Sequence, residues 1–396
     1  MSLTGASIGE EAESLRLRVI YCVDVLGVPE LVYACEFDRS GYAAAAKRYL
    51  RAFGAVGHDV AWLPLRNTMH GRVPASDAGT APETMKALPR QTIAGSPTVW
   101  HCMPQSWPAM RTAYPQGRFI GQTVWEADPI PTRWHEELAP ADELWVPTRW
   151  NAEVLAASGI TVPIHVVPHV VQTLAAAPPP VALDPSRFVL LTTSTWDWRK
   201  RPDLTLHAYL RAFTADDPVS LVVKTGARVH AWNCDTAVET HTWWQVMNVV
   251  RQYPNPAEVI LVTDEWTDAQ MVGMTAAADC YVSLTCSEGW GLGAFDAATA
   301  GVPVIMTGHG GQTEWLGTEH PGLVPFQLVP ADHPDTSMFE LGMVWAIADV
   351  DAAADMMRAV FHRSSPIIDV GPVLAGQVAD RYSEQAIGQL MTELLA

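Results

Sequence analysis

The segment 287–305, SEGWGLGAFDAATAGVPVI, combines glycines and acids at spacings that suit the binding of a phosphorylated ligand. The apolar segment CYVSLT precedes it and is typical of a strand, and AFDAATA is typical of a short helix. The glycines therefore lie at a strand-to-helix turn. The first N–H groups of a helix have no partner within the helix and bind phosphate oxygens well. We expect Gly291, Leu292 and Gly293 to approach a phosphate here.

Two acids flank these glycines. Asp296 lies about three to five residues inside the expected helix, so at about 1.5 Å per residue it is roughly 5 to 8 Å from the free N–H groups. A diphosphate and its ribose are separated by about that offset, and a carboxylate can accept hydrogen bonds from both ribose hydroxyls. Glu288 would face the other side of the diphosphate. The pattern predicts a nucleotide-sugar site; a tight connection without a ligand is the alternative.

The run E-G-W-G-L-G-A-F-D-A-A-T-A-G-V-P-V-I resembles the signature of the family-four retaining glycosyltransferases of the GT-B fold. That signature carries a second glutamate where Asp296 stands here. The resemblance implies sugar transfer from a nucleotide donor, with no metal ion or other cofactor required. It also implies front-face attack through a short-lived oxocarbenium-like ion pair, so no side chain is assigned as a nucleophile and the diphosphate itself takes the acceptor proton.

Positive charge is needed at a leaving diphosphate, because negative charge grows there as the glycosidic bond breaks. The segment STWDWRKRP resembles the basic loop of that family: Lys200 falls on its lysine, whereas Thr195 stands in place of its arginine. Arg199 or Lys224 could replace that charge, and both stay open. A solvated helix start is the alternative for 199–201, although cations at a helix N-terminus oppose its dipole unless they meet an anion.

Further candidate residues follow from the same resemblance. Gly310 and Gly311 resemble a loop whose backbone closes on the donor sugar, with a simple turn as the alternative. Gly41, in DRSGYAAAA, matches a glycine loop near the diphosphate and the acceptor, with an ordinary helix start as the alternative.

Two polar residues are expected at strand ends in the first half of the chain. His101 ends the predicted strand SPTVWH and resembles the sugar-contacting histidine of the family; a hydrogen-bonded core histidine is the alternative. Glu126 ends the predicted strand GRFIGQTVWE, where it could orient or deprotonate the acceptor; a surface acid before a proline turn is the alternative. The candidate catalytic residues are thus His101, Glu126, Lys200 and Glu288.

The elements that must position these residues form two series of alternating strands and helices. A chain of 396 residues is too long for one core, and the stretch 173–186, which contains PPP, is a natural linker. We predict an α/β protein with two doubly wound, Rossmann-like domains that face a cleft. The domains are 1–172, binding the acceptor, and 187–372, binding the donor, followed by a crossover helix at 373–396 that returns to the first domain.

Individual elements can also be predicted. RVIYCVDV, from 18 to 25, has the pattern of a buried strand, YAAAAKRYLRAFGAVG that of a helix and HDVAWLPL that of the next strand. In the second series we expect strands in RFVLLTTS, VSLVVKTG, AEVILVTDE, CYVSLT and VPVIM. After about residue 340 we expect the chain to turn helical and to end with an amphipathic helix over VADRYSEQAIGQLMTELLA.

Composition excludes several classes of function. The net charge of -18 would repel a nucleic acid or an anionic bilayer, so neither is an expected partner. The six cysteines have no metal-binding spacing and are expected to be reduced, and the first residues do not resemble a secretory signal, which favours a cytoplasmic protein. Asp349 and Asp351 resemble a metal-binding DxD motif but are better interpreted as a helix cap and a first-turn acid.

These observations favour a retaining transferase that moves a hexose-type sugar, from a UDP-sugar donor by family frequency, to a small hydrophilic acceptor. The alanine- and tryptophan-rich composition resembles that of a high-GC bacterium, and GQTVWEADPIPTRW resembles glycosyltransferases of natural-product pathways such as aminoglycoside assembly. Four alternatives stay open: a polysaccharide or cell-surface transferase, a nucleotide-sugar epimerase, an enzyme that couples two non-sugar rings, and a nucleotide-sugar binder without catalysis.

Overall fold

The computed structural model describes residues 30–36, 40–58, 60–68, 71–74, 95–230 and 232–396. Contacts group the chain into two compact units. Unit 1 comprises Met1–Val124, Thr132–Val170 and Arg381–Ala396, and unit 2 comprises Trp125–Pro131 and Val171–Asp380.

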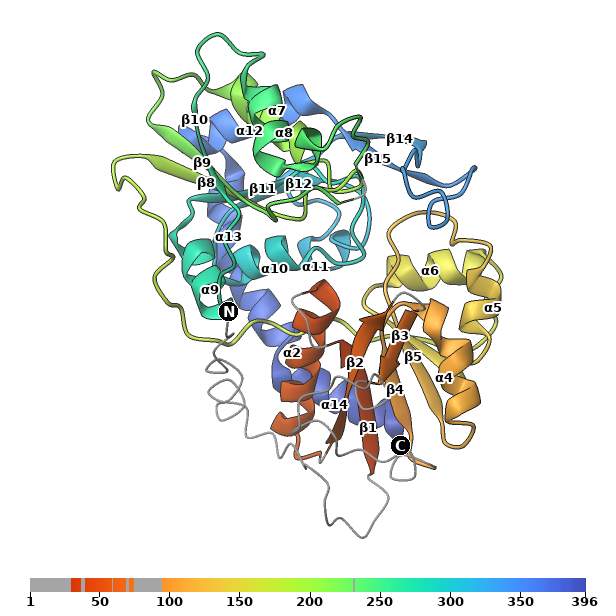
Figure 1. Ribbon diagram of the computed structural model, residues 1–396. Coiled ribbons are helices and arrows are strands. Elements are labelled where there is room, and N and C mark those ends of the chain that lie inside the picture. The colour runs from red at the N-terminus through yellow and green to blue at the C-terminus, as the bar shows by residue number, and fades with distance from the viewer. Residues whose placement is uncertain (1–29, 37–39, 59, 69–70, 75–94, 231) are drawn as a thin grey trace, which may run out of the picture. The chain divides into compact units, whose positions relative to one another are not determined.

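In its described residues, unit 1 is built on a sheet with the strand order β3-β2-β1-β4-β5-β6-β7 (Figure 1). All neighbouring pairs are parallel except β2 and β3. The strand order changes direction between β1 and β4, the place where doubly wound sheets bind ligands at their carboxyl ends. The strands are β1 (Leu31–Glu36), β2 (Val60–Thr68), β3 (Gly71–Pro74), β4 (Thr98–His101), β5 (Phe119–Gln122), β6 (Glu143–Val146) and β7 (Ile164–Val166).

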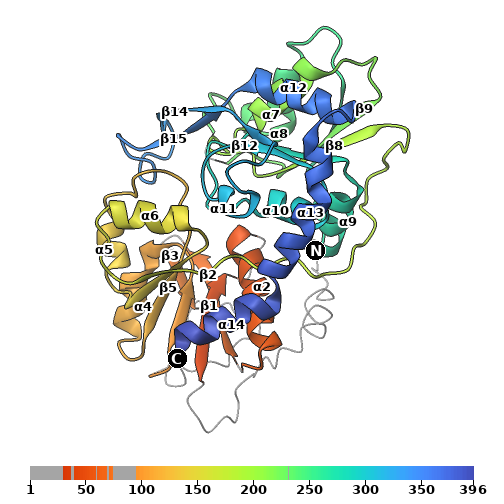
Figure 2. The same cartoon turned by 180° about the vertical axis from the view of Figure 1, so that it is seen from behind.

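The helix that follows β1 shows how the sequence specifies unit 1. Ser40 caps α2, because its hydroxyl accepts a hydrogen bond from the N–H of Ala43 at 3.1 Å. The C-terminal α14 packs against α2, and Figure 2 shows the two helices side by side. A Cβ added to Gly388 would lie 2.3 Å from the oxygen of Ala52, so the approach requires glycine. The helices are α2 (Gly41–Ala55), η3 (Pro104–Ser106), α4 (Trp107–Ala113), α5 (Trp134–Leu138), α6 (Arg149–Ala157) and α14 (Glu384–Leu395).

Unit 2 repeats the architecture with a parallel sheet in the order β10-β9-β8-β11-β12-β13. Its order changes direction between β8 and β11, again a switch point. The strands are β8 (Phe188–Thr193), β9 (Val219–Lys224), β10 (Glu258–Val262), β11 (Cys280–Ser283), β12 (Val304–Thr307), β13 (Leu323–Val324) and the antiparallel pair β14 (Phe326–Pro330) and β15 (Val344–Ala348). The helices are α7 (Pro202–Ala212), η4 (Val238–Thr240), α8 (Thr242–Val250), α9 (Asp268–Ala277), α10 (Leu292–Thr299), α11 (Thr313–Leu316), α12 (Val350–Phe361) and α13 (Pro366–Arg381).

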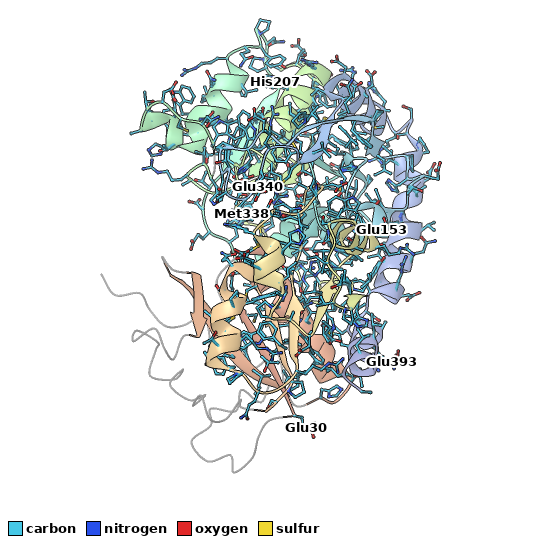
Figure 3. All side chains as sticks on the ribbon, turned by 90° about the vertical axis from the view of Figure 1, so that its right-hand side faces the viewer. Glu30, Glu153, His207, Met338, Glu340 and Glu393 are labelled. Atoms are coloured by element: carbon cyan, nitrogen blue, oxygen red, sulfur yellow. The ribbon has the colours of Figure 1, made fainter. Side chains whose placement is uncertain are left out.

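The short segment Trp125–Pro131 joins unit 2 although the flanking residues belong to unit 1. Asp128 and Val344 exchange backbone hydrogen bonds at 3.1 and 2.7 Å. The indole of Trp125 stacks on Phe339, with ring centroids 5.3 Å apart, in the loop between β14 and β15 on which Figure 3 labels Met338 and Glu340. This grouping places Glu126 in unit 2.

The fold class is confirmed, but three element predictions are wrong. The predicted strand ending at Glu126 ends at Gln122, because the N–H of Val124 bonds the hydroxyl of Tyr42 instead of a neighbouring strand. The region after residue 340 is not helical only, since β15 pairs with β14. The predicted terminal helix is divided into α13, which ends at Arg381, and α14. The hydroxyl of Ser383 accepts a hydrogen bond from the N–H of Ala386 and so forms a new N-cap for α14.

Other predictions have different outcomes. The strand predicted at 18–25 lies outside the described residues. The strand that precedes α2, Leu31–Glu36, was not predicted. Asp349 caps α12 as predicted, since its carboxylate accepts from the N–H groups of Asp351 and Ala352 at 3.0 and 3.1 Å. Among the described residues, no helix combines the length and the apolar character needed to span a bilayer.

Candidate functional site

The turn between β11 and α10 has the backbone geometry that a bound phosphate needs. Gly291 is the N-cap of α10 and has φ of +85°, a left-handed conformation that favours glycine. The N–H of Phe295 is the first to bond back along the helix, to the oxygen of Gly291 at 2.9 Å. The N–H groups of Leu292 and Gly293 precede that bond, so they belong to the open first turn.

Packing within the protein requires a glycine at position 293. A Cβ added there would lie 2.4 Å from Oγ1 of Thr193, the last residue of β8, and 2.5 Å from the hydroxyl of Tyr281 in β11. These two side chains also bond each other, at 3.0 Å. The first turn of α10 is therefore seated directly on the carboxyl ends of two central strands, at the switch point of the sheet.

The basic loop between β8 and α7 contacts the segment before α10. Nζ of Lys200 lies 2.6 and 2.7 Å from the two carboxylate oxygens of Glu288. Arg199 donates to the backbone oxygen of Ser287 at 2.6 Å, and its guanidinium lies 3.7 Å from Glu288. The N–H of Cys286 in turn donates to the oxygen of Arg199 at 2.8 Å. The two loops are thus joined by hydrogen bonds. The ion pair between Lys200 and Glu288 was not predicted, because the sequence analysis assigned the two residues separately to a diphosphate and to the ligand on its other side.

Arg199 connects a second carboxylate to this cluster. Its guanidinium lies 3.3 Å from Glu126, so it is shared between Glu126 and Glu288. The side chains of Arg199 and Glu288 are only 13% and 12% exposed, and that of Glu126 is 20% exposed. Buried charged groups are costly unless they are paired, which makes this concentration of them an indicator of function.

The charges in the cluster shift the pKa values of both acids, in opposite directions. Burial alone would raise the pKa of Glu288, but the charges of Lys200 and Arg199 outweigh it and hold that pKa below its usual range. For Glu126, burial dominates over the attraction of Arg199 and raises the pKa. Glu288 is therefore ionised at neutral pH and suited to accept hydrogen bonds from hydroxyl groups.

An aspartate that the sequence analysis missed orders the basic loop. Oδ1 of Asp197 accepts from the N–H of Arg199 at 2.9 Å, and Oδ2 contacts Nδ1 of His230 at 2.9 Å. His333 Nε2 is 3.9 Å from the same carboxylate. Burial opposes the ionisation of Asp197, yet these contacts lower its pKa. The cluster joins positions too distant in sequence for any local pattern to reveal it.

Gly310 and Gly311 lie against the backbone of the segment that carries Glu288. A Cβ added to Gly311 would lie 1.9 Å from the oxygen of Gly289, and the N–H of Gly311 donates to the oxygen of Glu288 at 2.6 Å. Gly310 has φ of +104°. These glycines pack against the backbone of the loop that carries Glu288. That they contact a donor sugar stays a prediction.

The remaining candidate residues of unit 2 are Lys224, which ends β9, and Asp296, which lies in α10. Nζ of Lys224, the last residue of β9, lies 5.6 Å from the ring centroid of Trp266, a cation–π contact. Asp296 is partly buried in α10. Thr195 is exposed, and Arg199, one of the two cations considered as replacements for an arginine there, contacts Glu288.

In unit 1, His101 ends β4 as predicted and is 3% exposed. Nδ1 of His101 lies 2.9 Å from the hydroxyl of Tyr33, and the rings of Tyr42 and Tyr49 pack on the imidazole. Burial lowers the pKa of His101 to about 3, so the ring is neutral at physiological pH. Gly41 is the first residue of α2, beside the Ser40 cap. Glu126 does not end a strand, since β5 ends at Gln122, which corrects the prediction.

Sequence comparisons give no relative for this chain. A scan against models of known protein families finds no match, and a search of curated proteins finds none either.

Solved structures, by contrast, resemble most of the chain. A sucrose-phosphate synthase from Thermosynechococcus elongatus matches with a TM-score of 0.62 at 15% identity, over 92% of this chain and 97% of its own. A trehalose-phosphate synthase from Burkholderia xenovorans, solved with glucose-6-phosphate, gives 0.60 at 10% identity, over 93% and 100%. S. aureus TarM, solved with UDP, gives 0.54 at 14% identity, over 76% of this chain but only 55% of TarM. The chain thus spans about half the length of TarM, and it has the GT-B fold.

Proposed function

We propose that this chain is a retaining, metal-independent glycosyltransferase that moves a hexose-type sugar from a UDP-sugar to a hydroxyl group of a small soluble acceptor. One observation carries the proposal: Lys200 and Glu288 pair beside the open first turn of α10. A cation, a helix N-terminus and a carboxylate together suit a diphosphate joined to a sugar. The GT-B fold supports it, since a trehalose-6-phosphate structure from E. coli with this fold is bound to UDP-2-fluoro glucose, and it matches with a TM-score of 0.59.

In the proposed reaction, unit 2 holds the donor. The N–H groups of Leu292 and Gly293 donate to the diphosphate, and Lys200 neutralises the charge that develops on it as the bond to the sugar breaks. Glu288 accepts hydrogen bonds from sugar hydroxyls. Arg199 fixes Glu288 through Ser287 and couples it to Glu126. The leaving diphosphate oxygen takes the proton of the acceptor hydroxyl, so atoms and charge balance without a protein nucleophile.

The test is to incubate the protein with UDP-glucose or UDP-N-acetylglucosamine and a panel of hydroxylated acceptors. We expect UDP release that depends on the acceptor, and a product whose anomeric proton in the NMR spectrum shows the donor's configuration. Inverted product would contradict the retaining mechanism. An altered sugar still attached to UDP would indicate an epimerase, and binding without any turnover would indicate a nucleotide-sugar binder.

Asp296 gives a prediction about affinity rather than chemistry. If its carboxylate accepts ribose hydroxyls, Asp296→Ala weakens UDP binding by about tenfold or more, because a hydrogen bond to a charged group contributes about 1.5–3 kcal/mol after the exchange with water is counted. The turnover number at saturating donor should change little. Calorimetry and saturation kinetics measure the two effects, and Asp355→Ala, an exposed acid in α12, is the matched control. Unchanged affinity in Asp296→Ala would remove the residue from the site.

A further inference from the structure

A buried polar network surrounds His101 at the carboxyl end of the unit 1 sheet. Tyr33, His101 and Gln122 come from the adjacent strands β1, β4 and β5, and His101 pairs directly with Gln122 in register. Tyr49 comes from α2, and His169 follows β7. All five side chains are at least nine-tenths buried, so each of their polar groups needs a partner within the protein.

The direction of each hydrogen bond follows from the number of available protons. The hydroxyl of Tyr33 has one proton and donates it to Oε1 of Gln122 at 2.6 Å. The 2.9 Å contact between that hydroxyl and Nδ1 of His101 must therefore be donated by the imidazole ring. His101 thus carries its proton on Nδ1.

The other half of the network joins Tyr49 to His169. The hydroxyl of Tyr49 donates to the backbone oxygen of Val167 at 2.9 Å, because a carbonyl can only accept. It therefore accepts from Nδ1 of His169, at 2.8 Å. His169 thus also carries a proton on Nδ1.

This arrangement leaves Nε2 of His101 with a lone pair and no proton. Within the described part of the chain, Nε2 of His101 makes no hydrogen bond. His101 ends β4, beside the switch point between β1 and β4. A neutral ring that offers a lone pair suits a hydroxyl group and does not suit a phosphate or carboxylate oxygen, which would need a donor.

We propose that Tyr33 and Gln122 are positioning residues that hold His101 in the Nδ1–H tautomer, which makes Nε2 an acceptor for a hydroxyl group of a sugar-like ligand. The identity of the ligand rests on the proposed function, whereas the tautomer does not. His101 accordingly selects a hydroxyl and takes no part in neutralising the diphosphate.

The tautomer can be measured in the full-length protein labelled with 15N-histidine. Long-range 1H–15N correlation spectra distinguish a protonated from an unprotonated ring nitrogen, and His101→Asn assigns the signal. We expect an unprotonated Nε2 in the wild type. In Gln122→Met the hydroxyl of Tyr33 loses its acceptor and donates its hydrogen bond to Nδ1 of His101 instead. The proton of the imidazole ring should therefore move to Nε2. Tyr33→Phe is a second variant, in which Nδ1–H loses its acceptor and the single fixed tautomer is lost.

Kinetics then test the role of the lone pair. The Gln122→Met variant should lose about tenfold or more in kcat/KM. Nε2 of His101 would then carry a proton, so the hydroxyl of the ligand would meet a donor instead of an acceptor. Its affinity for UDP should be unchanged, because the proposed UDP site lies in unit 2. Tyr253→Phe is the matched control: it removes a hydroxyl 2.9 Å from Nδ1 of His207 in unit 2 and should leave the His101 tautomer and kcat/KM as in the wild type.

Two results would overturn the proposal: a proton on Nε2 of His101 in the wild type, or a tautomer change in Gln122→Met with no loss of kcat/KM. If the wild type transfers no sugar at all, the proposed function fails, and the wild-type spectrum still decides whether the network sets the tautomer.

Discussion

Replacing Lys200 by methionine is expected to lower the turnover of a UDP-sugar by about a hundredfold to a thousandfold, the usual effect of removing one charge-stabilising donor from a reaction centre. Methionine preserves the length of the side chain and removes only its charge. Lys200 is the cation closest to Glu288, with both carboxylate oxygens within 2.7 Å, and the account assigns it to the leaving diphosphate. Steady-state kinetics at saturating donor measure the effect.

The matched control is Arg211→Ala. Arg211 lies in α7, the helix that follows the Lys200 loop, and its exposed ion pair with Asp351 contributes little. That variant should keep wild-type turnover. A Lys200→Met protein that is folded and turns over within about threefold of wild type would exclude Lys200 from the mechanism.

The same variant has an expected dependence on pH. The pKa of Glu288 is lowered in the folded protein, so its ionisation contributes stability above its unfolded pKa, and that contribution is lost as the pH falls through the folded value. Lys200 is a main cause of the shift. The difference in unfolding free energy between wild type and Lys200→Met should therefore be largest near neutral pH and shrink in acid, which denaturant titrations over a pH series would measure.

Substituting Gly311 by alanine is expected to affect both stability and activity. The new Cβ would lie 1.9 Å from the backbone oxygen of Gly289, so one of the two loops must move. Overpacking of this kind costs about 1–3 kcal/mol. Movement would also disturb the hydrogen bond from Gly311 to Glu288 and hence the position of the carboxylate. We expect a lower unfolding midpoint together with a loss of UDP-sugar turnover.

Gly376→Ala in α13 provides the comparison, because a Cβ there meets no atom within 4 Å. In an exposed helical position the change should be neutral or stabilise by about 0.5–1 kcal/mol. The opposite result would be an unfolding midpoint of Gly311→Ala equal to that of Gly376→Ala, together with wild-type turnover. It would show that the close packing of the two loops does not support the site.

Much of the local structure at the proposed donor site could be predicted from the sequence. Gly291, Gly293 and the start of α10 follow from a strand, a glycine-rich turn and a short helix in direct succession, a pattern that depends on neighbouring residues only. The resemblance to a known family assigned both Lys200 and Glu288 to one expected site, but it did not predict that they pair, and the two residues are far apart in the chain.

Contacts between distant residues account for what the sequence did not reveal. The strand predicted to reach Glu126 ends early because Tyr42 bonds the backbone of Val124, and TVWE carries no sign of that. Similarly, TWDWRKR gives no indication that His230 contacts Asp197. The strand β1 was missed although Gly27 and Pro29 precede LVYACE, because the longer apolar run RVIYCVDV upstream was assigned as the strand before α2.

The central claim is that unit 2 binds a nucleotide diphosphate at the turn before α10. Its most direct test is a calorimetric titration of UDP, with GDP, ADP and TDP for comparison, into the wild type, Lys200→Met and Asp296→Ala. The account predicts micromolar binding of UDP to the wild type and weaker binding to both variants. If none of the four nucleotides binds, or if UDP binds all three proteins equally, the turn is only a connection between β11 and α10 and the proposed donor site is wrong.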